Sequence, residues 1–264
     1  MVRCSMNNFA DMLWIESRKA IRSKMPLWTA LGSLFLPFGI GFLIFVSKNQ
    51  EIAHRLGLIS AKADLVAYAG TDWKAYLGLF GQLVAAGGYL LYVLAISWVF
   101  GREFVDGTLK DILAVPVRRA SILAAKFLVT ILWSAGLSLI IFTVGMALGA
   151  ALRLPGGSPG VLFQGSLLYL SEAGLTIVVV IPFAFLASLG RGYLLSISMA
   201  ALALMMANFV ALAGWGEYFP WAVPGLLAQG TTPLTFASYA IVLLTGLAGL
   251  VATYLWWKYA DQSH

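Results

Sequence analysis

Six long runs of apolar residues divide this sequence of 264 residues. A helix needs about 20 apolar residues to cross the roughly 30 Å of a bilayer's hydrocarbon core. The runs cover about 27–46, 76–100, 122–152, 161–189, 193–213 and 234–257. Strands of a membrane barrel are about 10 residues long and alternate polar with apolar side chains, unlike these runs. The sequence therefore predicts an all-α integral membrane protein, with one transmembrane domain (1–264) of six helices.

The composition of the chain excludes a soluble fold. Apolar residues make up 61% of the sequence and charged residues 11%, whereas soluble domains carry about 25% charged residues. The single cysteine, Cys4, cannot form an intrachain disulfide. A soluble enzyme, a disordered chain and a disulfide scaffold are therefore ruled out.

Basic residues gather on one side of the predicted spans. Of the 17 Lys and Arg residues, twelve flank the side that also holds both termini, and five flank the other. Membrane proteins keep the more basic side in the cytoplasm. We therefore expect a multi-pass protein of a bacterial-type inner (plasma) membrane with both termini cytoplasmic, and a first span retained because it is too long for a signal peptide. The net charge of +6 then reflects topology, and we expect no nucleic-acid partner.

Residues that carry most intramembrane chemistry are missing from the spans. The two histidines, His54 and His264, lie outside them, and neither an H-E-x-x-H motif nor a G-x-x-x-x-G-K-[ST] loop occurs. We therefore expect no catalytic residue, no metal site and no ATP site in this chain, and predict that it is not an enzyme.

The segment between the second and third spans, residues 100–119, is short and dense in charge. Asp106 or Thr108 can begin a helix, and Pro116 can end it. Apolar residues spaced along the segment would give that helix one apolar side. The segment predicts a short cytoplasmic helix at the membrane surface, with an ordinary charged loop as the alternative.

The same segment carries a recognisable signature. Its elements are Gly101-Arg102-Glu103, Gly107-Thr108-Leu109-Lys110, Pro116-Val117-Arg118-Arg119 and then Lys126. In this order and spacing they resemble the signature of ABC type 2 permeases, and most closely the bacitracin and lantibiotic self-protection exporters. The likeness extends more weakly over the whole chain, through a basic helix before the first span, six spans and an aromatic-proline hairpin before the last.

The resemblance implies that the segment couples the chain to a separate ABC ATPase subunit, which would bind ATP and Mg. A second permease copy, identical or paralogous, is implied as well. The implied coupling residues are Arg102, Glu103, Asp106, Gly107, Thr108, Pro116 and Arg119. Glu103 would contact the ATPase or the basic N-terminal helix. Gly107 and Thr108 would form the tight start of the coupling helix, and Pro116 would fix its exit.

Residues 1–26 predict a cytoplasmic amphipathic helix in the bilayer interface. Glu16 and Lys19 stand one turn apart and can form a local ion pair, and Arg22 extends the basic face. This helix has two possible roles, which are compatible with each other. It can be an anchor attracted to anionic lipid, or a mechanical element that also touches the ATPase.

Three polar residues near the spans are candidates for a substrate pathway or gate. Glu172 is a carboxylate inside a span, and such residues are functional suspects by default. Asn208 lies on the fifth span, where a hydrogen bond to a neighbouring helix is the simpler role. Glu217 lies in the aromatic stretch 214–233, which predicts an outer interface belt or a re-entrant helix at 218–227.

A GxxxG pattern stands at Gly145 and Gly149 on the third span, but such matches are frequent in apolar helices, so it is weak evidence for a dimer contact.

These features lead to a permease subunit of an ABC exporter that works by alternating access. An amphiphilic substrate, such as a peptide antibiotic, a drug or a lipid-like molecule, would suit spans with few polar groups. Two alternatives stay open: a channel or proton-coupled transporter that uses Glu172, and an immunity or anchor protein that sequesters a toxic peptide without moving it.

Overall fold

The computed structural model describes residues 8–48, 72–114, 117–230 and 234–259, and within these ranges it consists of helices joined by turns and loops, with no strand. Six helices in the described chain are long and apolar enough to cross a membrane, which confirms the six predicted spans. They are α2 (Met25–Lys48), α5 to α6 (Trp73–Val105), α8 (Arg119–Ala151), α9 to α10 (Pro159–Leu189), α11 (Leu194–Leu212) and α13 (Phe236–Tyr259).

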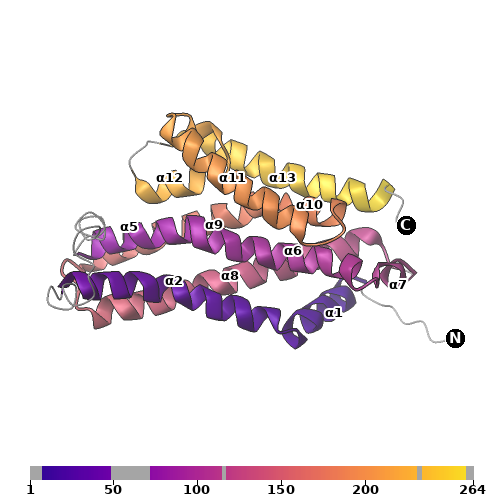
Figure 1. Cartoon of the computed structure of the whole chain (residues 1–264), viewed down its shortest axis with the longest axis horizontal. Coiled ribbons are helices and arrows are strands. Elements are labelled where there is room, and N and C mark those ends of the chain that lie inside the picture. The colour runs from indigo at the N-terminus through magenta and orange to yellow at the C-terminus, as the bar shows by residue number, and fades with distance from the viewer. Residues whose placement is uncertain (1–7, 49–71, 115–116, 231–233, 260–264) are drawn as a thin grey trace.

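Four shorter elements complete the described part of the chain. They are α1 (Asn8–Arg22), α7 (Leu109–Ala114), η2 (Gly216–Tyr218) and α12 (Val223–Gln229). The spans lie side by side, with α1, α7 and the end of α13 at one end of the bundle and the start of α5 at the other (Figure 1). Both α1 and α2 pack against α8, and α5 packs against α9. The expected outer loop between the first two spans lies largely outside the described residues.

Two spans are less regular than their sequence pattern suggests. The second span consists of α5 (Trp73–Leu83), a π-helical turn η1 (Val84–Gly88) and α6 (Tyr89–Val105). The fourth is broken between α9 (Pro159–Val180) and α10 (Phe183–Leu189). Pro182 lies at this break, where a proline cannot donate to the helical ladder.

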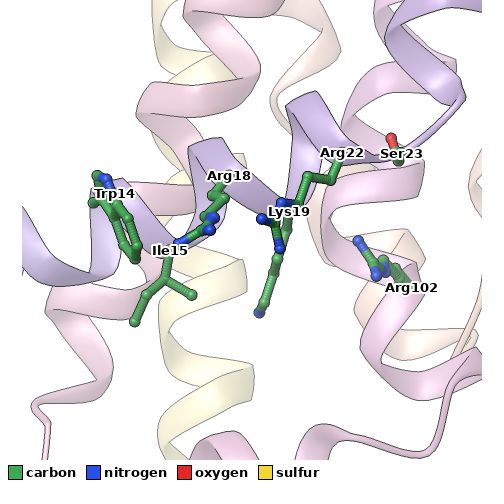
Figure 2. A pocket seen from close by; sticks show the side chains of 7 residues that line it. All are labelled: Trp14, Ile15, Arg18, Lys19, Arg22, Ser23 and Arg102. Atoms are coloured by element: carbon green, nitrogen blue, oxygen red, sulfur yellow. The ribbon is translucent and has the colours of Figure 1, made fainter.

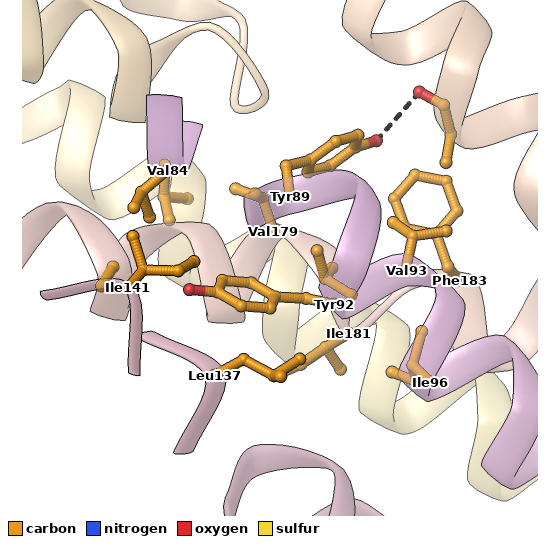
Figure 3. Close-up of a cluster of buried hydrophobic side chains, with 14 of the residues drawn as sticks. Val84, Tyr89, Tyr92, Val93, Ile96, Leu137, Ile141, Val179, Ile181 and Phe183 are labelled. Atoms are coloured by element: carbon orange, nitrogen blue, oxygen red, sulfur yellow. Dashed lines mark hydrogen bonds between the residues drawn. The ribbon is translucent and has the colours of Figure 1, made fainter. Parts of the chain in front are cut away.

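Tyrosine hydroxyls cross-link the apolar core, part of which Figure 3 shows. Tyr76 donates to the carbonyl of Gly145 (2.7 Å) and Tyr89 to that of Ala200 (3.1 Å). Tyr169 donates to the carbonyl of Ser138 (2.8 Å), whose hydroxyl bonds Tyr92. A buried tyrosine needs such a partner, so these bonds fix how α5, α6 and α9 pack on α8 and α11.

The GxxxG pattern of the third span packs within the chain, in agreement with its weakness as evidence for a dimer contact. Gly145 and Gly149 are buried inside the chain. A Cβ atom at Gly145 would meet the ring of Phe80, and one at Gly149 would meet those of Trp73 and Tyr76. The two glycines therefore make room for aromatic side chains of α5 in the same subunit.

The aromatic stretch before the last span folds back onto the bundle. Its short helix α12 packs against α5 and α9, with Val223 and Ala228 buried. The indole nitrogen of Trp221 donates to the carbonyl of Val179 (3.0 Å). The stretch is therefore more than an aromatic belt, because one of its helices is part of the protein core.

Candidate functional site

Four charged side chains meet where α1, α6 and α8 come together. Lys19 Nζ lies 2.8 Å from Glu16 Oε1 and 3.1 Å from Glu103 Oε1. Lys126 Nζ lies 3.2 Å from Glu16 Oε2 and 2.7 Å from Glu103 Oε1. We call Glu16, Lys19, Glu103 and Lys126 the four-charge cluster. It carries two positive and two negative charges, so it is neutral as a whole.

Three members of the cluster are almost closed to their surroundings, whereas the side chain of Lys19 is 29% exposed. Lys126 is 0% exposed, Glu103 3% and Glu16 5%. An ammonium group has three protons to donate, and the third proton of Lys126 goes to the carbonyl of Val99 (3.0 Å). Taking ions out of water costs several kcal/mol each unless partners compensate them. The mutual pairing is therefore a condition for α1 to pack where it does.

The two cluster residues on α1 have shifted pKa values. Burial by itself would raise the pKa of the Glu16 carboxyl, but the ammonium groups of Lys126 and Lys19 outweigh it and hold that pKa below its ordinary value. Burial by itself would lower the pKa of Lys19, but Glu16 and Glu103 raise it above its ordinary value. Both residues are therefore held in their charged forms.

Local sequence places each charge. Glu16 and Lys19 stand on one side of α1, and the buried side of this helix also carries Met12, which packs against Ile122 and Ala125 of α8. Next to Lys126, the rings of Phe127 and Phe100 pack with centroids 4.7 Å apart. Apolar contacts thus set the distance between helices, and the ion pairs fill the polar gap between them.

The local ion pair expected for Glu16 and Lys19 is present. Glu103 was expected to contact either the ATPase or the N-terminal helix. In the structure it contacts the N-terminal helix, through Lys19. The pairing of Glu16 with Lys126 was not predicted, because the two residues are 110 positions apart. The sequence does place Lys126 within an apolar span, and a charge at such a position requires a buried partner. It does not indicate which residue that partner is.

The turn after the second span depends on one glycine. The helix α6 ends at Val105, and Gly107 has a φ of +69° before α7 begins at Leu109. Only glycine adopts this conformation without strain. The carbonyl of Thr108 accepts the first helical bond of α7, from Ile112 (3.3 Å). Pro116, expected to fix the exit of this helix, lies outside the described residues.

Two arginines expected in the coupling site have partners within the chain. Arg119 donates to the carbonyls of Trp257 (2.6 Å) and Lys258 (3.1 Å) at the end of α13. Arg102 pairs with Asp106, one turn further along α6, at 3.0 Å. Arg119 therefore ties the start of the third span to the end of the sixth.

Glu172 is a fully buried carboxyl on α9 (0% exposed), and neither of its oxygens has a hydrogen-bond partner in the described chain. It lies against Gly81 of α5, so close that a Cβ atom there would collide with it. Ala228 of α12 approaches the same point. The short helix α12 therefore covers a polar group that the core leaves unsatisfied.

Asn208 and Glu217 lie apart from Glu172. Asn208 donates to the carbonyl of Leu204 in its own helix (2.9 Å), and within the described residues it forms no bond to a neighbouring helix. With Gln82 and Gln229 it lines a cavity of about 200 Å³ between η1, α11 and α12. Glu217 lies on η2 and bonds the hydroxyl of Tyr218, which raises the pKa of that tyrosine. In the described chain, no three His, Cys, Asp or Glu side chains gather to hold a metal ion.

Comparison with known proteins identifies the class of this chain. The model of the ABC-2 family transporter protein matches residues 12–208, a range that contains the whole four-charge cluster. The chain belongs to this family, whose permeases are non-enzymatic membrane subunits that work with an ABC ATPase subunit. It is thus a multi-pass membrane subunit of an ABC exporter.

A curated relative narrows the comparison. The chain is similar to the bacitracin transport permease protein BCRB of Bacillus licheniformis, with 28% identity over 177 residues. These residues are 66% of this chain and 85% of the relative. No solved structure matches the chain.

Proposed function

We propose that this chain moves an amphiphilic substrate out across the plasma membrane by alternating access. ATP and Mg would bind a separate ATPase subunit, which docks on the segment 100–119 at the cytoplasmic side. A second permease copy completes the pathway. Both termini face the cytoplasm in this arrangement.

The observation that carries the proposal is the four-charge cluster. It joins α1 to α6 directly before the turn to α7, and it joins both to α8 directly after the segment. A displacement of α7 by a docked ATPase therefore pulls on the second and third spans together. ATP and substrate need only bind the two conformations with different affinities for this displacement to drive transport.

The substrate class follows from the apolar spans and from the similar relative. That relative is, by its name, a bacitracin transport permease. A peptide antibiotic is accordingly the first substrate to test, followed by amphiphilic drugs and lipid-like molecules.

The test is co-purification of this chain with its ABC ATPase in mild detergent, followed by ATP-driven transport in proteoliposomes. Lys110 and Asp111 are exposed on α7, and the double variant Lys110→Glu/Asp111→Lys should lose the ATPase and transport. The matched control is Lys74→Glu, an exposed residue at the other end of the bundle, which should retain both.

A chain that never binds an ATPase would refute the proposal. An immunity protein that only sequesters its peptide would protect cells equally well beside a hydrolysis-deficient ATPase.

The unsatisfied carboxyl of Glu172 favours a second candidate, a proton-linked transport step. A buried polar group without a partner is costly, and a functional role would explain its retention. In this case Glu172→Gln abolishes transport driven by a pH gradient without ATP, while the control Asp11→Asn, on α1 outside the spans, retains it. If transport requires ATP and is the same in Glu172→Gln, this candidate fails.

A further inference from the structure

A cavity of about 310 Å³ lies beside the four-charge cluster, at the elbow between α1 and α2 (Figure 2). Four cationic side chains line it: Arg18, Lys19 and Arg22 from α1, and Arg102 from α6. Trp14 and Ile15 form an apolar rim. Figure 2 shows Arg102 reaching toward α1 from its separate helix. The cavity therefore presents positive charge from two elements to one space.

The positive charge of the cavity is only partly neutralised. Lys19 belongs to the neutral four-charge cluster, and Arg102 pairs with Asp106. Arg18 and Arg22 have no carboxylate partner in the part of the chain that the structure describes. Two uncompensated guanidinium groups thus face the cavity, which favours an anion there.

Two of the arginines are held in place before any ligand arrives. Arg18 lies over the ring of Trp14 (4.8 Å to the centroid) and Arg102 over that of Trp98 (4.9 Å). The Nη1 atom of Arg102 is buried and has no hydrogen-bond partner within the described residues. Such a donor is costly to leave unused, and an acceptor inside the cavity would satisfy it.

The position of the cavity identifies the source of that acceptor. Ser23, on its wall, comes two residues before the first span begins at Met25. Arg102 comes three residues before the second span ends at Val105. At a rise of about 1.5 Å per residue, both walls lie at the level where spans leave the hydrocarbon. Ile21 and Trp28 are exposed nearby (78% and 63%), as expected of side chains that face lipid.

We propose that this cavity binds the phosphate of an anionic membrane phospholipid, such as phosphatidylglycerol. Arg18 and Arg22 supply the charge, Arg102 donates its free N–H, and the acyl chains leave over Trp14 and Ile15. Basic pockets at the cytoplasmic ends of spans are suited to anionic headgroups. The lipid bridges α1 to α6 from outside, next to the four-charge cluster that joins them inside. The proposal does not depend on the ATPase or on the transported substrate.

The experiment is native mass spectrometry of the delipidated full chain titrated with dioleoylphosphatidylglycerol or dioleoylphosphatidylcholine. The two lipids share acyl chains, so a difference in affinity reports the headgroup. We expect phosphatidylglycerol to bind at least tenfold more tightly, and Arg18→Gln/Arg22→Gln to remove that preference. Both arginines are exposed, and circular dichroism checks that this variant keeps its helices. The matched control is Lys74→Gln/Arg153→Gln, which removes the same charge from two exposed residues elsewhere.

Equal affinity for the two lipids would overturn the proposal, and so would equal loss in both double variants. Competition by millimolar inorganic phosphate without any lipid preference would point to a free anion and also overturn it. An unchanged lipid preference in Arg18→Gln/Arg22→Gln would overturn it as well.

Discussion

Lys126 is fully buried in a membrane-spanning helix and donates to Glu16, Glu103 and the carbonyl of Val99. Replacing it in Lys126→Met leaves two buried carboxylates that share only Lys19. Removing one partner of a buried ion pair costs about 3–5 kcal/mol. At about 2–4 °C per kcal/mol for a chain of this size, we expect the Tm in detergent to fall by about 6–20 °C.

The control for this prediction is Lys110→Met, which removes an exposed lysine of α7 and should leave the Tm almost unchanged. Adding Glu103→Gln to Lys126→Met should recover part of the loss, since it removes one of the two carboxylates that then share Lys19. A Tm that is the same in Lys126→Met and the wild type would show that the cluster contributes nothing to stability.

The shifted pKa of Glu16 makes the docking of α1 sensitive to acid. Its pKa is lowered from an ordinary value of 4.5, so its contribution is present above pH 4.5 and is lost as the pH falls through the lowered pKa. The pKa of Lys19 is raised from 10.5, so its contribution is present below that pH and is lost only as the pH rises through the raised pKa. Between these limits the cluster is fully charged.

We therefore expect the Tm to fall more between pH 5 and pH 3 in the wild type than in Glu16→Gln. Asp11→Asn, on the same helix, should keep the wild-type dependence. An identical fall in Glu16→Gln would assign the acid sensitivity to other groups.

At the scale of elements, the turn between α6 and α7 offers a direct test of coupling. The φ of Gly107 is +69°, and a residue with a Cβ atom in this region costs about 1–2 kcal/mol. Gly107→Ala should therefore shift α7 relative to α6 and reduce ATP-driven transport several-fold, while ATP hydrolysis persists. Gly136→Ala is the control, because a Cβ atom at that position of α8 meets nothing within 4 Å.

The spans were predictable because hydrophobic length is a local property of the sequence. The interruptions of the spans were less predictable. The proline at position 182 is a sequence signal for the break in the fourth span, whereas nothing in the apolar pattern indicates the π-helical turn at Val84–Gly88. The position of α12 against α5 and α9 depends on contacts between distant segments. The aromatic and proline content of the stretch 214–233 was equally compatible with a belt of side chains at the membrane surface.

The site was predictable only in parts for the same reason. Glu16 and Lys19 are one turn apart, so their ion pair follows from helix geometry. The other pairs of the cluster join residues 84, 110 and 23 positions apart, and single-sequence reasoning does not specify such contacts. Gly145 and Gly149 show the opposite case, because a familiar dimer motif serves packing within one subunit.

At the scale of the whole molecule, both ends of the described chain lie at one end of the bundle. The four-charge cluster holds α1 there, and Arg119 holds the end of α13 there through the carbonyls of Trp257 and Lys258. Together with α7 they form the end that carries most of the basic residues (Figure 1). The positive-inside rule predicts that this end is cytoplasmic.

This orientation is testable with the single cysteine of the chain, Cys4. We expect the N-terminus to face the cytoplasm, so a membrane-impermeant maleimide should label Cys4 in inside-out vesicles and leave it unlabelled in right-side-out vesicles. The variant Cys4→Ser/Lys74→Cys moves the thiol to the start of α5 and should reverse the pattern. Labelling of Cys4 from the outside would show that the topology is the opposite of the expected one. The segment 100–119 would then lie out of reach of a cytoplasmic ATPase.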